Sequence, residues 1–427
     1  MSRYVFNSLV GFTSTAFLFA FLSGTGCPSA PDTGMDSAYN NTTDRTNAGA
    51  PYLGSEACRA CHPGIDEDQS IHGHAHKLTP VFGQAPEFPA AGLRAGVPDP
   101  PDGFDWSEIA WMIGGYTRKA RFIDQDGFVL TTGVEGVDTQ WNLLFPANGT
   151  EPGFVPYEAG AESPKPYAYS CFVCHTTGPM PQDEDEPQFQ ENRPGFIGTW
   201  QEPGVQCESC HGPGSRHVAN PSARDLFVDN SAQFCGECHN RPFDSDGSVI
   251  LASGGYIKHH EQYPELLASG GHATFDCVTC HKPHVSTNYD RDNAIRNECT
   301  ACHTNATMAL HEGLTFERGD YTEVLGCESC HMPFATRSAT SASAATVGDV
   351  GRLGDTRTHI FRISTENADF TSMFNADMSA VAKDGEGNAA VTVDFVCIRC
   401  HNGIGNAFEL SVDSASEIAI GMHLGIP

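Results

Sequence analysis

The cysteines of this 427-residue chain follow one repeated pattern. Sixteen of the 17 cysteines lie in eight copies of the motif Cys-x-x-Cys-His. Two thiols three positions apart can add to the two vinyl groups of one porphyrin, and the next residue then offers its imidazole to the iron, so the motif predicts covalently attached haem c. The predicted thioether residues are Cys58, Cys61, Cys171, Cys174, Cys207, Cys210, Cys235, Cys238, Cys277, Cys280, Cys299, Cys302, Cys327, Cys330, Cys397 and Cys400. The predicted proximal iron ligands are His62, His175, His211, His239, His281, His303, His331 and His401.

Other uses of paired cysteines fit this pattern poorly. A zinc site takes four ligands from two separated Cys or Cys/His pairs. A thioredoxin-like redox site has one Cys-x-x-Cys near a βαβ pattern. Neither explains a histidine directly after all eight pairs. We therefore expect eight haem c groups and no catalytic cysteine.

The remaining histidines are candidates for the second axial ligand of each iron. The chain has 19 histidines, so 19 − 8 = 11 lie outside the motifs, and by position they form eight groups. A second histidine on every iron gives six-coordinate haems, which suit electron transfer because no site is open to substrate. The sequence leaves open the choice among His72, His74 and His76, and between His259 and His260. The candidate distal ligands are His74, His217, His259, His272, His284, His311, His359 and His423.

Two of these candidates stand close behind a motif. His217 follows His211 by six residues, and His284 follows His281 by three. Neither can easily cross to the far face of its own porphyrin. Each is therefore expected to bind the iron of a neighbouring haem, which would bring two macrocycles close together.

The first 27 residues indicate export. Arg3 precedes an apolar run, Val10 to Leu22, and a small-residue stretch ends at Cys27, a pattern typical of a secretory signal. Cys27 lies where a lipoprotein signal places its lipidated cysteine, although Gly24 stands where such signals usually have an aliphatic residue; cleavage beyond Cys27 is the alternative. Residues 28–50 are polar and small, as in a disordered tether. We expect a periplasmic, outer-membrane or cell-surface lipoprotein without a membrane span in the mature chain.

The spacing of the motifs predicts the organisation of the rest. Residues 51–337 would form a haem-rich body with seven motifs and a β-containing insertion at 63–170, and residues 338–427 a C-terminal segment with a linker and the eighth motif. A hairpin is expected near 105–145, because Gln125-Asp126-Gly127 separates two apolar runs. Otherwise we expect a mainly α fold with much irregular loop, wrapped around the haems.

Several segments resemble a known superfamily. Cys171-Phe172-Val173-Cys174-His175-Thr176-Thr177-Gly178, the Cys-Glu-Ser-Cys-His-Gly-Pro-Gly-Ser run from Cys207, His259-His260-Glu261-Gln262-Tyr263 and the Cys-Glu-Ser-Cys-His-Met-Pro run from Cys327 are similar to multihaem cytochromes of the cytochrome c-554 and doubled-CxxCH type. The resemblance spans most of residues 51–427. It implies a mainly helical, loop-rich body with stacked and perpendicular haem pairs, bis-histidine irons and an exported carrier role.

The same superfamily includes octahaem enzymes, so function has alternatives. Several of those enzymes replace the proximal histidine of the active haem with lysine, and this chain does not. We expect an electron carrier or relay that is not an enzyme. The alternatives are an oxidoreductase acting on nitrite or hydroxylamine at one open haem, and a subunit of an extracellular cytochrome filament or conduit.

The charge of the chain bears on its partners. With 24 Lys+Arg and 53 Asp+Glu, the formal net charge is 24 − 53 = −29. Phosphate would be repelled, so nucleic acid is not expected as a partner. The charge is explained first by solubility; the alternative is that it steers a basic redox partner, with an attraction that weakens as salt is added.

Overall fold

The computed structural model describes residues 43–44, 50–185, 187–222, 226–241, 246–338 and 341–423. The predicted signal segment, Cys27 and most of the predicted tether lie outside these residues. The longest helix within them has ten residues, and none is long and apolar enough to cross a membrane.

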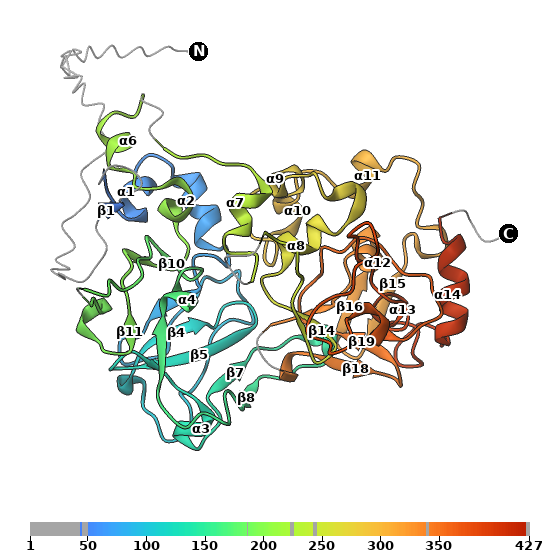
Figure 1. Cartoon of the computed structure of the whole chain (residues 1–427), viewed down its shortest axis with the longest axis horizontal. Coiled ribbons are helices and arrows are strands. Elements are labelled where there is room, and N and C mark those ends of the chain that lie inside the picture. Colours follow the sequence, from blue (N-terminus) through green and yellow to red (C-terminus); the bar gives the residue numbers. More distant parts are fainter. Residues whose placement is uncertain are drawn as a thin grey trace, which may run out of the picture.

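The helices are short and many of them carry a haem motif. In five motifs the backbone N–H of the histidine donates to the carbonyl of the first cysteine at 2.9 Å, so the motif itself closes one helical turn. Several of these helices lie along one edge of the molecule, from α1 to α11 (Figure 1). The helices are α1 (Ser55–Arg59), α2 (Pro63–Ser70), α3 (Thr132–Glu135), α4 (Tyr169–Phe172), α5 (Cys207–His211), α6 (Ser215–Ala219), α7 (Ala232–Gly236), α8 (Gln262–Leu267), α9 (Cys277–Cys280), α10 (Arg291–Ala294), α11 (Cys299–Cys302), α12 (Cys327–His331), α13 (Val393–Val396) and α14 (Val412–Gly421).

An eight-stranded sheet takes seven of its strands from the first long gap between motifs, and its strand β11 (Phe196–Ile197) follows the second motif. Six strands follow the order β11-β9-β6-β5-β4-β3, and β7 joins β5 to β8. All pairs are antiparallel except β9 with β11. The strands are β3 (Leu78–Pro80), β4 (Ile109–Gly114), β5 (Lys119–Asp124), β6 (Phe128–Val129), β7 (Gln140–Asn142), β8 (Gly153–Val155), β9 (Lys165–Ala168) and β11 (Phe196–Ile197).

The other strands form small ladders elsewhere in the chain. β13, β14 and β17 make a three-stranded sheet, and the rest are two-stranded. They are β1 (Thr43–Asp44), β2 (Ala50–Pro51), β10 (Thr176–Thr177), β12 (Glu202–Pro203), β13 (Ala252–Ser253), β14 (Tyr256–Lys258), β15 (Thr315–Arg318), β16 (Tyr321–Val324), β17 (Thr336–Arg337), β18 (Ala345–Val347) and β19 (Gly351–Leu353).

The expected hairpin is present, as strands β5 and β6. Ile123 pairs with Val129 across it, and Asp124 Oδ1 accepts from the N–H groups of Asp126 and Phe128 at 2.9 and 2.8 Å. Gly127 has φ +90°, and a Cβ there would lie 3.0 Å from the backbone of Phe196. Glycine therefore suits this turn both by its backbone angle and by the close approach of the neighbouring chain.

The prediction of a mainly α fold is wrong. Strands run through both long gaps and between the motifs, while most helices are single turns. A Cys-x-x-Cys-His motif specifies only one helical turn, so eight motifs do not add up to long helices. The 63–170 segment, expected to hold a small hairpin, instead contributes most of an eight-stranded sheet.

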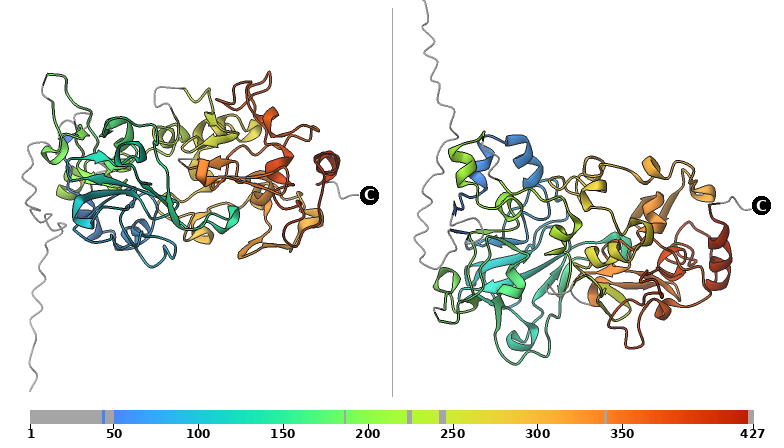
Figure 2. Two further views of the ribbon diagram at one scale, coloured as in Figure 1. Left: turned by 90° about the horizontal axis from the view of Figure 1, so that it is seen from below. Right: turned by 45° about the horizontal axis from the view of Figure 1, so that its top comes forward.

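Both faces of the large sheet are buried. Alternate residues of β4 and β5 point to opposite sides: Met112 and Phe122 belong to one apolar cluster, and Trp111 and Ile123 to another. The second cluster also contains Phe172, from the Cys171 motif, so one face of the sheet supports that motif. A separate cluster joins residues 250–268 with 335 and 360–396. Sheet and C-terminal residues thus occupy opposite ends of the molecule in two views (Figure 2).

Candidate haem-ligand sites

We number the eight motif sites in chain order, from site 1 (Cys58 to His62) to site 8 (Cys397 to His401). Every motif histidine has a second imidazole ring near it. Ring centres lie 5.6–6.5 Å apart in the pairs His62–His217, His175–His260, His211–His284, His239–His74, His281–His359, His303–His272, His331–His423 and His401–His311.

These separations fit an iron atom between the two rings. Two imidazoles that each bond a metal ion at about 2 Å have ring centres roughly 6 Å apart. Seven of the eight predicted distal histidines are in these pairs, the exception being His259. His217 and His284 each lie against the histidine of another motif, as their position in the sequence predicts.

Several of these rings are anchored through Nδ1. Backbone carbonyls accept from Nδ1 of His211, His331, His401 and His423 at 2.8–3.0 Å, and Gln262 Oε1 accepts from His239 at 2.9 Å. An N–H donated from Nδ1 fixes the tautomer that leaves the Nε2 lone pair for a metal. The donor chemistry therefore fits axial ligation of haem iron.

The two ambiguous histidine groups have distinct neighbours. His259 Nε2 lies 3.1 Å from a guanidinium nitrogen of Arg241, which can only donate. His260 has φ +64°, unusual for a residue with a Cβ. Its ring lies 6.5 Å from that of His175 and 5.8 Å from that of His239.

The other group divides in a similar way. His74 lies 6.0 Å from His239. The Nδ1 atom of His72 accepts from the backbone N–H of His74, and His76 Nε2 lies 2.8 Å from the carbonyl oxygen of Ser70. Of the three, His74 is the one whose ring faces a motif histidine.

Residues between the motif cysteines join sites to one another. Glu208, inside the site 3 motif, accepts from the N–H groups of Leu53 and Gly54 at 3.0 and 2.8 Å, directly before the helix of site 1. It also accepts from Gly214 at 2.6 Å. Burial raises the pKa of Glu208, and these three donors oppose that rise. One carboxylate thus holds site 1 against site 3.

A buried ion cluster joins sites 7 and 8. Arg399, inside the site 8 motif, donates to Glu323 at 2.7 and 3.1 Å and to the carbonyl of Ser329, inside the site 7 motif, at 2.9 Å. Ser329 and Arg357 also donate to Glu323. Burial alone would raise the pKa of Glu323, but Arg399 and Arg357 hold it at about 2.

An exposed arginine makes a comparable link between sites 6 and 7. Arg291 donates to Glu298, just before the site 6 motif, at 3.1 Å and to Glu328, inside the site 7 motif, at 3.0 Å. Exposed pairs of this kind contribute little to stability. They nevertheless fix which motifs are neighbours.

Thiols of different motifs also approach one another. Burial raises the pKa of several of these thiols, and a cysteine of another site raises it further, as for Cys280 beside Cys302. In the pair Cys58 and Cys207 a hydrogen bond between the thiols is the main cause. The neighbouring pairs are Cys58–Cys207, Cys210–Cys238, Cys174–Cys238, Cys235–Cys277, Cys280–Cys302, Cys299–Cys327 and Cys330–Cys400. By these contacts the sites run in the order 1-3-4-5-6-7-8, with site 2 attached to site 4.

Site 2 has an unusual surrounding charge. The pKa of His175 is lowered to about 3 by its burial and by the positive charges of Lys77, Arg121 and Arg241. Arg241 and Lys77 also lower the pKa of Cys174, after a hydrogen bond to Cys238. None of the ion pairs among the described residues includes any of these three cations. Three cations therefore gather at one site of a strongly acidic chain, with the carboxyl groups of Glu158 and Glu261 near Arg121 and Arg241 respectively.

The ring of His175 also differs in its anchor. Its Nδ1 lies 3.0 Å from the phenol oxygen of Tyr167. The anchored rings described above instead contact a carbonyl or amide oxygen. Tyr167 is on β9 and only 1% exposed. Sequence reasoning could not find this contact, because nothing in the motif specifies a residue eight positions earlier.

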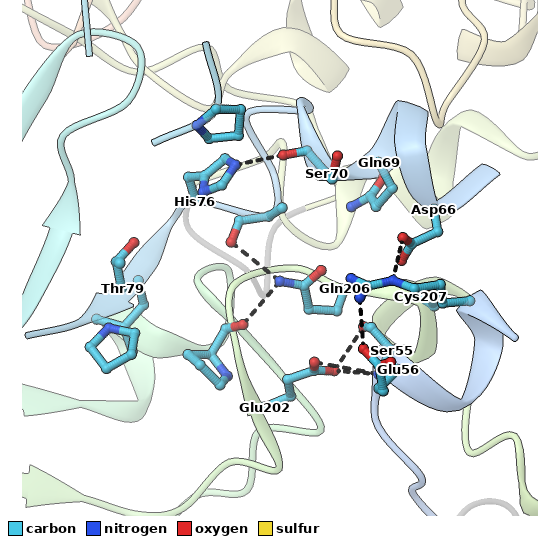
Figure 3. Close-up of a pocket in the computed structure, with 16 residues that line it drawn as sticks. Ser55, Glu56, Asp66, Gln69, Ser70, His76, Thr79, Glu202, Gln206 and Cys207 are labelled. Carbon is cyan, nitrogen blue, oxygen red and sulfur yellow. Dashed lines mark hydrogen bonds and ion pairs between the residues drawn. The ribbon is translucent and has the colours of Figure 1, made fainter. Parts of the chain in front are cut away.

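A cavity of about 430 Å³ lies beside site 3. It opens between α1, α2, β3 and β12, and Cys207 lines it (Figure 3). Gln206 bridges its wall by donating to the carbonyls of Ala75 and Pro203, both at 3.3 Å, and Glu202 accepts from Ser55 on the other side. Because Cys207 is a predicted thioether residue and opens into this cavity, part of a covalently attached macrocycle would fit there.

Comparisons with known proteins agree with this arrangement. The sequence model of a family described as cytochrome c554 and c-prime matches residues 158–212. Dissimilatory sulfite reductase MccA of Wolinella succinogenes is 24% identical, over 78% of this chain and 57% of that protein. Multiheme cytochrome MtrA of Shewanella baltica is also 24% identical, over 45% of this chain and 54% of that protein. The chain spans little more than half the length of either relative.

One solved structure supports the fold. The octaheme sulfite reductase MccA of Wolinella succinogenes aligns with a TM-score of 0.56 at 18% identity, covering 90% of this chain and 73% of that one. At this level of identity the likeness concerns the fold alone.

Proposed function

We propose that this chain, a multihaem c-type cytochrome with covalently bound haem c, is an extracytoplasmic electron relay with eight bis-histidine haems. The observation that carries the proposal is the second imidazole, 5.6–6.5 Å away, beside every motif histidine. When bound, each haem supplies a one-electron Fe(III)/Fe(II) couple.

The residues of the chain have two tasks in this proposal. The paired histidines would hold each iron and leave no position for outside ligands, and the contacts of the anchored Nδ1 groups keep their rings oriented. Contacts between motifs, such as those of Glu208 and Arg399, keep successive sites close. The resulting path runs from site 1 to site 8 through neighbouring thiols.

We assign His260 and His74, in place of His259, His72 and His76, as the distal ligands of sites 2 and 4. Because Arg241 can only donate, its contact uses the Nε2 lone pair of His259 that an iron would need. His260 is close to both His175 and His239, and pairing His239 with His74 leaves His260 for site 2.

The test is an electron paramagnetic resonance spectrum of the oxidised protein, with carbon monoxide binding to the reduced protein. We expect low-spin signals only and little binding. His260→Ala should then produce high-spin haem equal to one iron in eight, whereas His259→Ala, the matched neighbour, should not. A stoichiometric high-spin signal in the unmodified protein would contradict the proposal.

The location outside the cytoplasm rests on the sequence. A secretory pattern ends at Cys27, and we propose lipid attachment there. Mass spectrometry of the mature N-terminus is expected to give an acylated Cys27. A mature chain that starts beyond Cys27 would exclude lipid attachment at this cysteine.

A second candidate function is reduction or oxidation of a small substrate at site 2. It is favoured by the positive charges of Lys77, Arg121 and Arg241 near His175, which would attract an oxyanion such as nitrite or sulfite. It requires that His260 leave the iron. Turnover of nitrite, sulfite or hydroxylamine at about 1 s⁻¹ or faster, with ligand binding at one haem in eight, would favour this candidate over the relay.

A further inference from the structure

Site 2 combines two features that act on a haem potential in the same direction. Positive charge near an iron favours the ferrous state, and the acceptor on the ligand's second nitrogen tunes how much electron density the imidazole donates. Arg121 and Arg241 are guanidinium groups and remain charged at any working pH. Glu158 lies near Arg121, and Glu261 lies near Arg241 but has a pKa raised to about 8 by burial. The two positive charges act in a partly buried setting, where screening by water is weak.

The position of these charges is fixed by the fold. Both Nε and one terminal nitrogen of Arg121 donate to Gln140 at 3.1 and 3.0 Å, and its guanidinium lies 3.7 Å from the ring centre of Tyr157. Arg241 is held at 3.1 Å from His259. Neither contact neutralises the positive charge.

The anchor of His175 is the second feature. With Nε2 on an iron, the Nδ1 proton must be donated, so the Tyr167 oxygen accepts it. A phenol oxygen is a weaker acceptor than the carbonyl and amide oxygens that hold His211, His239 and His331. His175 therefore has less imidazolate character than those ligands, and its iron is stabilised less in the ferric state.

From these two features we propose that the haem of site 2 has the highest reduction potential in the chain and is where electrons collect. This inference rests on the proposed relay. Among the described residues, the thiols of site 2 meet the path at site 4, through Cys174 and Cys238, and Thr177, just after the site 2 motif, also bonds Ser209 of site 3 at 2.8 Å. One electron that passes from a ferrous neighbouring haem to the ferric haem of site 2 would remain there, because the potential of site 2 is higher. Site 2 would then store an electron beside the main path.

The test is a spectroelectrochemical titration of the full-length holoprotein in three variants. Tyr167→Phe removes the acceptor and should shift the first of eight one-electron steps to more positive potential. Arg121→Gln and Arg241→Gln should each shift that same step to more negative potential. The other seven steps should move much less.

Controls separate these effects from structural damage. Arg121→Lys and Arg241→Lys keep the charge and should restore most of the shift. Arg193→Gln removes the charge of an arginine that is ion-paired with Glu191 and lies beside Gln125, and should leave the first step in place. Haem content, measured by mass spectrometry, checks that each variant carries eight haems. If Arg121→Gln binds fewer than eight, the shift measured in Arg241→Gln is used to test the charge effect.

Two outcomes would overturn the inference. One is a first step that moves in none of the three variants. The other is a shift confined to haems that are reduced later. A high-spin site 2 in the paramagnetic resonance experiment would instead refute the bis-histidine relay, while leaving the order of potentials to be read from the same titration.

Discussion

At the scale of single residues, the variable positions of the haem motifs hold sites together. Glu208 and Arg399 both lie between motif cysteines, and each reaches the backbone next to or within another motif. The variable residues of a motif therefore also position the neighbouring motif, in addition to the motif's predicted role in binding its own haem. The five-residue pattern predicts the thioether and proximal residues directly, because all of them are local in sequence.

Glu323 provides a test of this linking role. Glu323→Gln should destabilise the protein by about 3–5 kcal/mol at pH 7, since it leaves the buried Arg399 without its charged partner. The folded pKa of Glu323, about 2, is below its unfolded value of about 4.3. The stabilisation is therefore present above about pH 4 and is lost as the pH falls toward 2.

Denaturant unfolding of the holoprotein at several pH values would measure this effect. The difference in unfolding free energy between the unmodified and variant proteins should narrow below about pH 4. Glu317→Gln, on an exposed position of the neighbouring strand β15, is the control and should have little effect. A difference that is constant from pH 7 to pH 3 would contradict the assigned ionisation of Glu323.

Other residue-level features lie beyond what the sequence could predict. His259 and His260 are adjacent and chemically identical, and only the backbone angle of His260 and the contact of Arg241 distinguish them. The anchor of His175 on Tyr167 depends on how β9 runs into α4. Both are consequences of tertiary structure, and neither has a signature in the spacing of histidines.

At the scale of elements, the turn residues predicted the hairpin correctly, whereas the prediction of a mainly α fold was wrong. The hairpin of β5 and β6 follows from the Asp126-Gly127 turn, whose geometry is local. The extent of the sheet does not, because strands as short as β9 and β11 gain their pairing from distant residues. The resemblance implied a mainly helical body, and the single-turn helices of this chain did not fulfil it.

The sheet should make its own contribution to stability. Phe122→Ala is expected to cost about 3–5 kcal/mol, because Phe122 is fully buried in the cluster with Ile109 and Met112. Phe82→Ala is the matched control, since Phe82 is 83% exposed and such changes stay within about 0.5 kcal/mol. Unfolding followed by circular dichroism would compare them; equal losses would mean that the sheet adds little to the fold.

At the scale of the whole molecule, charge and site order suggest how partners approach. Asp66 and Glu67 lie on α2 beside site 1, and Glu409 and Asp413 lie near site 8. The two ends of the proposed path are on opposite sides of the molecule, at α1 and at α13 with α14 (Figure 1). Acidic residues are therefore present at both ends, and the net charge of −29 reinforces their effect.

This distribution predicts a salt-dependent reaction with a basic redox partner. The second-order rate of electron transfer to a small cationic haem protein should fall by about tenfold or more between 10 and 500 mM salt, because the Debye length shrinks from about 30 Å to a few ångströms. Stopped-flow mixing of the reduced protein with that acceptor measures the rate. An acidic acceptor of similar size and potential is the matched control, and its rate should rise with salt because screening reduces the repulsion. A rate to the cationic acceptor that does not change with ionic strength would mean that electrons leave through a surface without net charge, and the acidic ends would then serve solubility alone.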